Sequence, residues 1–289
     1  MALTIPGNRR SASWPLDRIH RMGVGLGYRP EIARDIMRHH SEIEVLEILA
    51  DRVIRGGRRE WDEIRDLSKI IPLIPHGVNL SIGSVDCLKS SEYLKTLKRL
   101  TRWMACPYYS DHFALTKVRG ADIGHLTPLW RTREQLDVVV SNTLAMQKRI
   151  QKPLVLETIT IPFEIPGFEM SATQFINEAT ERTGCGLLLD LANIFINGAN
   201  HGFDPAGFLE SLNLAAVVQI HLAGGIRNGG AWIDSHSERV HPAVWKLLKA
   251  YAPRLPNLKA IIIERDSHFV DFKALLAEVR KAKAIWESA

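Results

Sequence analysis

Eight short apolar runs recur along the chain, separated by longer amphipathic stretches. The runs cover residues 22–28, 44–50, 72–78, 108–114, 153–160, 185–193, 216–223 and 258–265. Most are apolar almost throughout, which is typical of parallel strands whose two faces are both buried. Eight alternating strand and helix units favour an α/β fold, the (β/α)8 TIM barrel.

Two of the amphipathic stretches have clear helix boundaries. A helix is predicted over residues 132–150, and Thr132 with Gln135 predicts a capping box at its start. A second helix is predicted over residues 171–183, with Gly184 ending it in the C′ position. Such boundaries support the assignment of these stretches as the helices that follow barrel strands.

No linker, low-complexity tract or internal repeat interrupts the pattern. The interpretation is therefore one barrel domain over residues 21–289, preceded by an N-terminal extension over residues 1–20. The longest predicted loops, 116–130 and 224–233, follow the fourth and seventh strands. Both are expected to overhang the mouth of the barrel, where active sites of this fold lie.

Composition limits the kinds of partner and the cellular compartment that we expect for this protein. The chain of 289 residues carries a net charge of +5 without a dense Lys/Arg block, so nucleic acid is not expected as a partner. No apolar run approaches the ~20 residues that span a bilayer, and the first residues lack the apolar segment of a signal peptide. Cys87, Cys106 and Cys185 are scattered, which predicts free thiols in a reducing compartment, and we expect a cytoplasmic protein.

Histidines and carboxylates stand at the ends of six consecutive apolar runs and in the segment after the seventh. The set comprises His76, His112, Glu157, Asp190, Asn193, His221, Asp234, His236 and Glu264. In a barrel the carboxyl ends of all strands meet at one mouth, so these side chains are expected to converge. Four clustered carboxylates would repel one another unless cations neutralised them, and mixed imidazole and carboxylate ligands suit Zn, Mn and non-haem Fe.

A partition into three metal ions follows from the order of the strands. The predicted groups are His76, His112 and Glu157; Glu157, Asp190, His221 and Glu264; and Asn193, Asp234 and His236. Glu157, Asp190 and His221 are the predicted catalytic residues. Glu47, after the second strand, is expected to face the mouth as a substrate-binding or supporting residue, and Asp111, on the strand face opposite His112, to support a ligand.

Several sequence strings resemble those of one enzyme family. They are PHGVNLSIGS, SDHFA, TGCGLLLD, LLLDLANIFINGANHGFDP, QIHLAGG and IDSHSE. Together they closely resemble the multinuclear non-haem iron-dependent oxidative enzymes, the family of the methanobactin oxidase subunit, within the xylose-isomerase-like barrels. The resemblance spans about residues 22–266. The related endonuclease IV branch has a histidine three residues after the strand-six aspartate, where this chain has Asn193.

The resemblance implies an enzyme that holds two or three iron ions in mixed Fe(II) and Fe(III) states and uses O2 as co-substrate. It implies oxidation of a side chain, often cysteine, near the C-terminus of a ribosomally made precursor peptide. His201 also fits the family pattern, as a substrate-binding or supporting residue. The chain has no spare segment for peptide recognition, so a separate partner protein that binds the leader is expected.

Two departures from the family pattern leave the substrate and the reaction open. Many members carry Glu-Asn where this chain has Glu157-Thr158, and many carry a histidine where it reads GYRPEIA. A metal-dependent phosphodiesterase or a sugar isomerase on the same barrel is the alternative enzyme. A non-enzymatic metal store or peptide chaperone is the alternative from another class.

Overall fold

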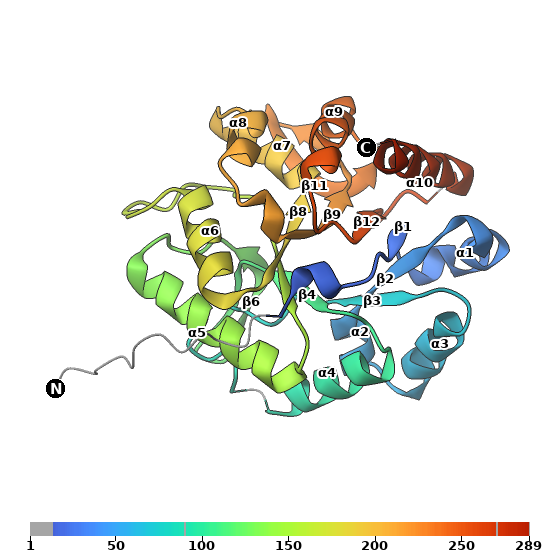
Figure 1. Ribbon diagram of the computed structural model, residues 1–289, viewed down its shortest axis with the longest axis horizontal. Coiled ribbons are helices and arrows are strands. Elements are labelled where there is room, and N and C mark those ends of the chain that lie inside the picture. Colours follow the sequence, from blue (N-terminus) through green and yellow to red (C-terminus); the bar gives the residue numbers. More distant parts are fainter. Residues whose placement is uncertain (1–13, 90, 270, 289) are drawn as a thin grey trace.

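A computed structural model describes residues 14–89, 91–269 and 271–288. Eight parallel strands form a closed barrel in the order β1-β12-β9-β8-β7-β4-β3-β2 (Figure 1). They are β1 (Gly23–Gly27), β2 (Val45–Leu49), β3 (Leu73–His76), β4 (Tyr109–His112), β7 (Leu154–Glu157), β8 (Gly186–Asp190), β9 (Val217–Leu222) and β12 (Ala260–Ile263). The predicted (β/α)8 barrel is confirmed. Most of the predicted N-terminal extension, residues 1–20, lies outside the described residues.

Helices surround the strands on the outside of the barrel (Figure 1). They are α1 (Ala33–Arg38), α2 (Ala50–Arg55), α3 (Arg58–Ser68), α4 (Ser91–Trp103), α5 (Arg133–Ile150), α6 (Ala172–Thr183), α7 (Leu191–His201), α8 (Pro205–Glu210), α9 (Pro242–Tyr251) and α10 (Phe272–Glu287). Short 3₁₀ turns are η1 (Leu16–Arg18), η2 (Pro30–Ile32), η3 (His40–Glu42), η4 (Leu214–Ala216) and η5 (Ala252–Arg254). Within the described ranges, no helix has both the length and the apolar character required to cross a membrane.

The caps of two helices match the sequence closely but not fully. Ser171 and Gln174 form a complete capping box at the start of α6, and Gly184 ends that helix with a φ of 64°. The predicted box at the start of α5 is only half formed. The Thr132 side chain accepts a hydrogen bond from the Gln135 amide nitrogen, but the Gln135 side chain donates to a backbone carbonyl of a distant loop.

The inside of the barrel is polar at the mouth, where the strands end, and apolar in the layer further from the mouth. Ile74, Val155, Leu188 and Ile262 belong to one buried apolar cluster. Each lies two residues before a histidine or carboxylate at its strand end, and side chains two apart on a strand point to the same face. The alternation of the strands therefore places the polar residues inside the barrel, above the apolar layer.

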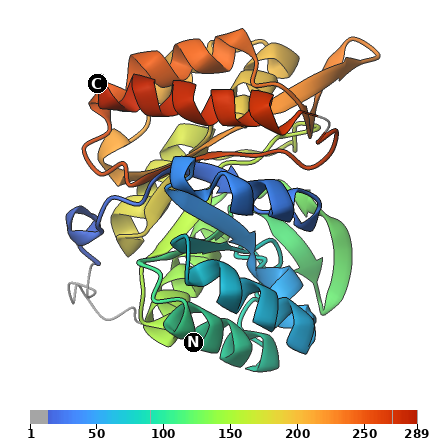
Figure 2. The same ribbon diagram turned by 90° about the vertical axis from the view of Figure 1, so that its right-hand side faces the viewer.

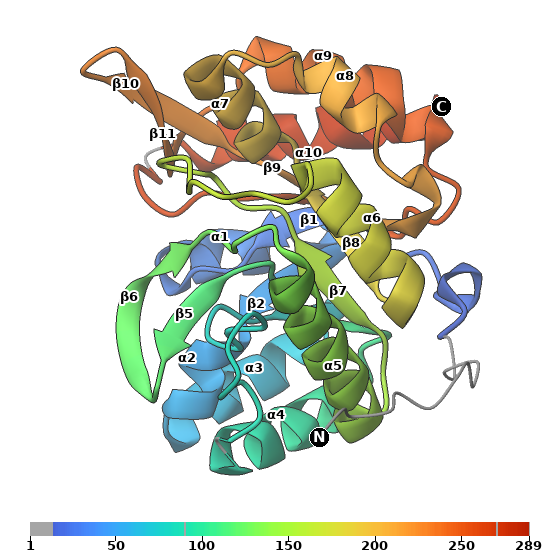
Figure 3. The same cartoon turned by 90° about the vertical axis from the view of Figure 1, so that its left-hand side faces the viewer.

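Both segments predicted as long loops contain β-hairpins. Strands β5 (Leu115–Val118) and β6 (Ala121–Thr127) form one, and β10 (Gly224–Asn228) and β11 (Ala231–Glu238) form the other. The two hairpins project on the same side of the molecule (Figures 2 and 3). Gly229 and Gly230, with φ of 57° and 90°, supply the positive angles that a tight hairpin turn needs. The two long connections after the fourth and seventh barrel strands were expected as loops, and each contains a β-hairpin instead.

Candidate metal centre

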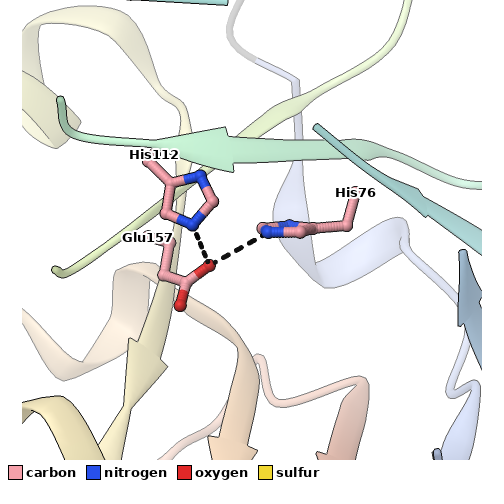
Figure 4. Close-up of side chains that lie close together, drawn as sticks. All are labelled: His76, His112 and Glu157. Atoms are coloured by element: carbon pink, nitrogen blue, oxygen red, sulfur yellow. Dashed lines mark ion pairs between the residues drawn. The ribbon is translucent and has the colours of Figure 1, made fainter. Parts of the chain in front are cut away.

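His76, His112 and Glu157 come from the ends of three neighbouring strands, β3, β4 and β7, and point toward one another (Figure 4). The Oε2 atom of Glu157 lies 3.3 Å from Nε2 of His76 and 3.2 Å from Nε2 of His112. All three side chains are buried. Nδ1 of His76 lies 2.9 Å from the Ser110 hydroxyl, and Nδ1 of His112 lies 3.1 Å from the Gly77 carbonyl oxygen. These contacts hold both rings with Nε2 toward the glutamate.

A second group adjoins the first and shares Glu157 with it. It contains Glu157, Asp190, His221 and Glu264, and one ligand atom from each lies within 4.8 Å of the others. Nδ1 of His221 lies 3.4 Å from Oε1 of Glu157 and 3.0 Å from Oε2 of Glu264. Glu157 thus turns one carboxylate oxygen toward each group, as a bridging ligand would.

The residues predicted for a third ion lie at the edge of the second group. Asp234 and His236 lie on β11, not in a loop, because the β10–β11 hairpin carries them back to the mouth. Nε2 of His236 lies 2.7 Å from Oδ1 of Asp234 and 3.9 Å from Oδ2 of Asp190. Asn193 is buried, and its backbone N–H donates to Oδ1 of Asp190, which caps α7.

Six polar atoms of these groups are buried and make no hydrogen bond of acceptable geometry with the described residues, although some lie close to an opposite charge. They are Glu157 Oε2, Asp190 Oδ2, Asn193 Oδ1, His221 Nδ1, Asp234 Oδ1 and His236 Nε2. Buried polar atoms without partners are rare in folded proteins because each one loses its hydration without compensation. Their number and their mixture of nitrogen and oxygen fit a site for metal cations, which would satisfy them together.

The electrostatics of the groups point the same way. Burial raises the pKa of Asp190 well above its usual range, and the neighbouring Asp234 raises it further. Burial also opposes ionisation of Glu157, but His112 and His221 lower its pKa to about 2. Burial disfavours the charged form of His112, yet Glu157 and Asp111 raise its pKa to about 9. Without metal, a protonated histidine balances part of the negative charge of the carboxylates. Bound metal ions would supply that positive charge instead.

The three residues predicted as substrate-binding or supporting groups lie in different places. Glu47 lies within β2, not after it, and points into the barrel, with Oε1 3.0 Å from Nε2 of His221. Asp111 accepts hydrogen bonds from the Tyr109 hydroxyl and from the backbone N–H of His112. His201, at the end of α7, has Nε2 2.6 Å from a backbone carbonyl oxygen of the loop after β7.

Sequence reasoning missed other side chains that contact the predicted ligands. Ser110 contacts His76, Gln219 contacts His221, and Oδ2 of Asp266 lies 3.4 Å from Nδ1 of His236. Ser110 and Gln219 each precede a predicted ligand on the same strand by two residues, and Asp266 follows Glu264 by two. The period of two along a strand was the signal that could have identified them.

A largely apolar cavity of about 360 Å³ lies near the ends of β4 and β7. Phe113 and Thr158, which directly follow His112 and Glu157 in the chain, contribute to its lining. Phenylalanine and isoleucine side chains of α6, α7, α8, the α7–α8 connection and the loop after β7 supply much of the remaining lining. The cavity therefore lies near the ends of β4 and β7, and none of the predicted metal ligands lines it.

Comparison with known families identifies the group to which this barrel belongs. The model of the family described as "RiPP precursor modification enzyme MbnB/TglH/ChrH" matches residues 23–287. The chain belongs to this family. A UPF0276 protein from Caulobacter vibrioides is 36% identical over 265 residues, covering 91% of this chain and 94% of its own. A UPF0276 protein from Neisseria meningitidis is 30% identical over 265 residues, covering 89% of this chain and 93% of its own. The resemblance noted in the sequence is thereby confirmed.

Solved structures support the fold independently of the family. Endonuclease IV from Thermus thermophilus aligns with a TM-score of 0.61 at 18% identity, covering 93% of this chain and all of that one (100%). D-psicose 3-epimerase from Clostridium cellulolyticum aligns with a TM-score of 0.60 at 13% identity, covering 92% and 97%. Both are xylose-isomerase-like barrels, and at these identities the likeness concerns the fold alone.

Proposed function

We propose that this protein is a multinuclear non-haem iron enzyme that uses O2 to oxidise a side chain of a ribosomally made precursor peptide. The modified residue is cysteine or another residue near the peptide's C-terminus. The observation that carries the proposal is the sharing of Glu157 between two adjoining groups of buried imidazoles and carboxylates. Membership of a family of precursor-peptide modification enzymes supports the class of substrate.

Three sets of ligands would hold the ions. His76, His112 and Glu157 would bind the first, Glu157, Asp190, His221 and Glu264 the second, and Asn193, Asp234 and His236 the third. Imidazole together with carboxylate and amide oxygen suits non-haem iron, and no thiolate lies among these donors. When bound, iron would supply the electrons that reduce O2 and the open coordination positions where O2 and the substrate meet.

The residues of the chain would orient the reactants and limit access of water. Glu157, Asp190 and His221 are proposed as the catalytic residues because they hold the shared and central positions of the groups. The β5–β6 and β10–β11 hairpins project on the same side of the barrel and would flank an incoming peptide (Figure 3). The apolar cavity beside Thr158 would take up a side chain next to the modified residue, and a separate partner protein would present the leader.

The first experiment is elemental analysis of protein purified without oxygen from iron-supplemented cells. We expect about two to three irons per chain, with mixed valence after partial oxidation. Zinc or manganese with negligible iron would contradict the iron assignment and favour a metal-dependent phosphodiesterase or a sugar isomerase on this barrel.

The second experiment tests the reaction itself. Iron-loaded protein and its partner are incubated with cysteine-containing precursor peptides, and the peptide mass is measured with and without O2. A mass change that requires both iron and O2 is expected. Hydrolysis of a phosphodiester or isomerisation of a sugar, each without O2 uptake, would overturn the proposal, as would iron-loaded protein that binds peptide but never changes it.

A further inference from the structure

Three buried polar side chains form a connected chain directly beneath the second metal group. Oε1 of Glu47 lies 3.0 Å from Nε2 of His221. The side-chain amide of Gln219 donates a hydrogen bond to Oε2 of Glu47, and the Tyr108 hydroxyl donates to Oε1 of Gln219 at 2.7 Å. Glu47 is 3% exposed and the other two are fully buried. These residues come from β2, from β9 and from the position just before β4, so they link the barrel from side to side.

The two nitrogens of His221 face different environments. Nδ1 faces Glu157 and Glu264, the side on which an ion would bind, whereas Nε2 faces Glu47. A carboxylate can only accept hydrogen bonds, so Glu47 favours the form of the ring that carries a proton on Nε2. In that form the lone pair of Nδ1 is free to bind a metal ion.

Gln219 is oriented to support this arrangement. Because the Tyr108 hydroxyl donates to its Oε1 atom, the amide must turn its NH₂ group toward Glu47. That nitrogen also lies 2.8 Å from Nε2 of His221. If Gln219 donated to Nε2 of His221, the ring proton would lie on Nδ1 and would prevent metal binding there. In the metal-bound protein, the Gln219 amide N–H and the His221 Nε2–H are therefore both directed at the Glu47 carboxylate.

We infer that Glu47 is a positioning residue of the metal centre, which fixes the tautomer and the ring orientation of His221, and that Gln219 and Tyr108 hold Glu47 in place. A carboxylate on the outer nitrogen of a ligating histidine also makes the ring a stronger donor to the metal. The inference rests on the proposed function only in requiring that an ion binds at Nδ1 of His221. It needs neither the identity of the peptide nor the outcome of its oxidation.

The test compares Glu47→Gln with Glu278→Gln. Glu278 is also buried, but it pairs with Arg265 and the Val240 N–H outside the metal groups. Each protein is loaded anaerobically with Co(II), and the affinity is measured by competition with a chelator while the d–d absorption spectrum is recorded. We expect Glu47→Gln to lower the affinity for one Co(II) ion by about 10- to 100-fold and to change the d–d spectrum of that ion. Glu278→Gln should match the wild type in both.

A second variant keeps the inference testable if Glu47→Gln folds poorly. Tyr108→Phe removes only the hydroxyl that orients Gln219, and it should change the Co(II) spectrum in the same direction by a smaller amount. Unchanged affinity and spectrum in the folded variants would overturn the inference while leaving the proposed function intact. Wild-type protein that binds no metal ion would instead overturn the proposed function, and the inference with it.

Discussion

Gly77 and Tyr109 lie so close together that a β-carbon on residue 77 would stand 1.7 Å from the Tyr109 hydroxyl oxygen. The tyrosine has no room to retreat, because it is fully buried and its hydroxyl donates to Asp111. The backbone of Gly77 donates to the Ser110 carbonyl, and its own carbonyl oxygen lies beside Nδ1 of His112. A residue without a side chain therefore allows the end of β3 to approach β4 and to orient a predicted ligand.

Gly77→Ala is expected to destabilise the metal-free protein by about 1–3 kcal/mol, the usual cost of forcing an extra carbon into a packed core. It should also weaken binding of the first ion, because the carbonyl that holds His112 must move. Urea unfolding and metal analysis measure the two effects. Gly57→Ala is the control, since only one atom, at 3.8 Å, lies near that position. Equal stability of the two variants would contradict the steric explanation.

Glu157→Gln is expected to lower the occupancy of two ions, whereas His76→Ala should lower that of one. The reason is that Glu157 faces both groups with different oxygens, and a glutamine has only one oxygen with which to bind a metal. Elemental analysis of both variants, loaded under identical conditions, measures the difference. Loss of a single ion in Glu157→Gln would show that the carboxylate does not bridge.

The metal-free protein is expected to lose stability as the pH rises through about 9. The pKa of His112 is about 9 in the folded protein, above its ordinary value of 6.5, so its interaction with Glu157 stabilises the fold fully below pH 6.5 and disappears above about pH 9. Metal affinity should change in the opposite direction over this range, because the ion must displace the proton. Urea unfolding and chelator competition across this pH range measure both. His112→Asn should reduce the pH dependence of stability but not remove it, because burial lowers the pKa values of His221 and His236 less than the Glu264 carboxylate and its neighbours raise them.

His236→Gly is expected to be more stable than His236→Ala by about 1 kcal/mol in the absence of metal. His236 has a φ of 46°, a left-handed conformation that costs a residue with a β-carbon about that much and glycine almost nothing. Both variants should lose the third ion equally. Thermal unfolding of the two proteins is the measurement, and an alanine variant as stable as the glycine variant would show that the backbone relaxes without cost.

Ala172→Trp is expected to raise the peptide concentration needed for half-maximal reaction without changing the metal content. The position lines the apolar cavity near the ends of β4 and β7, and an indole there would occupy space proposed for a substrate side chain. Dependence of the reaction rate on peptide concentration tests this. An unchanged dependence would show that the peptide follows another route to the metals.

The sequence alone determined the barrel and most of its polar mouth. Apolar runs that end in His76, Glu157, Asp190 and Glu264 predict convergence, because parallel strands of a closed barrel all end at one mouth and alternate side chains share one face. The two adjoining groups follow from this rule and from the order of the strands. Both the barrel and the two groups can be predicted from patterns within short segments of the sequence.

Tertiary structure decided the contacts that join distant strands. Glu47 touches His221 across 174 residues, and the Gln135 side chain reaches a carbonyl 52 residues away rather than its own helix start. Asp234 and His236 reach the mouth only because the β10–β11 hairpin folds back over it. Such contacts depend on the register between strands and on the side-chain conformations that packing permits, and both exist only after the barrel has closed.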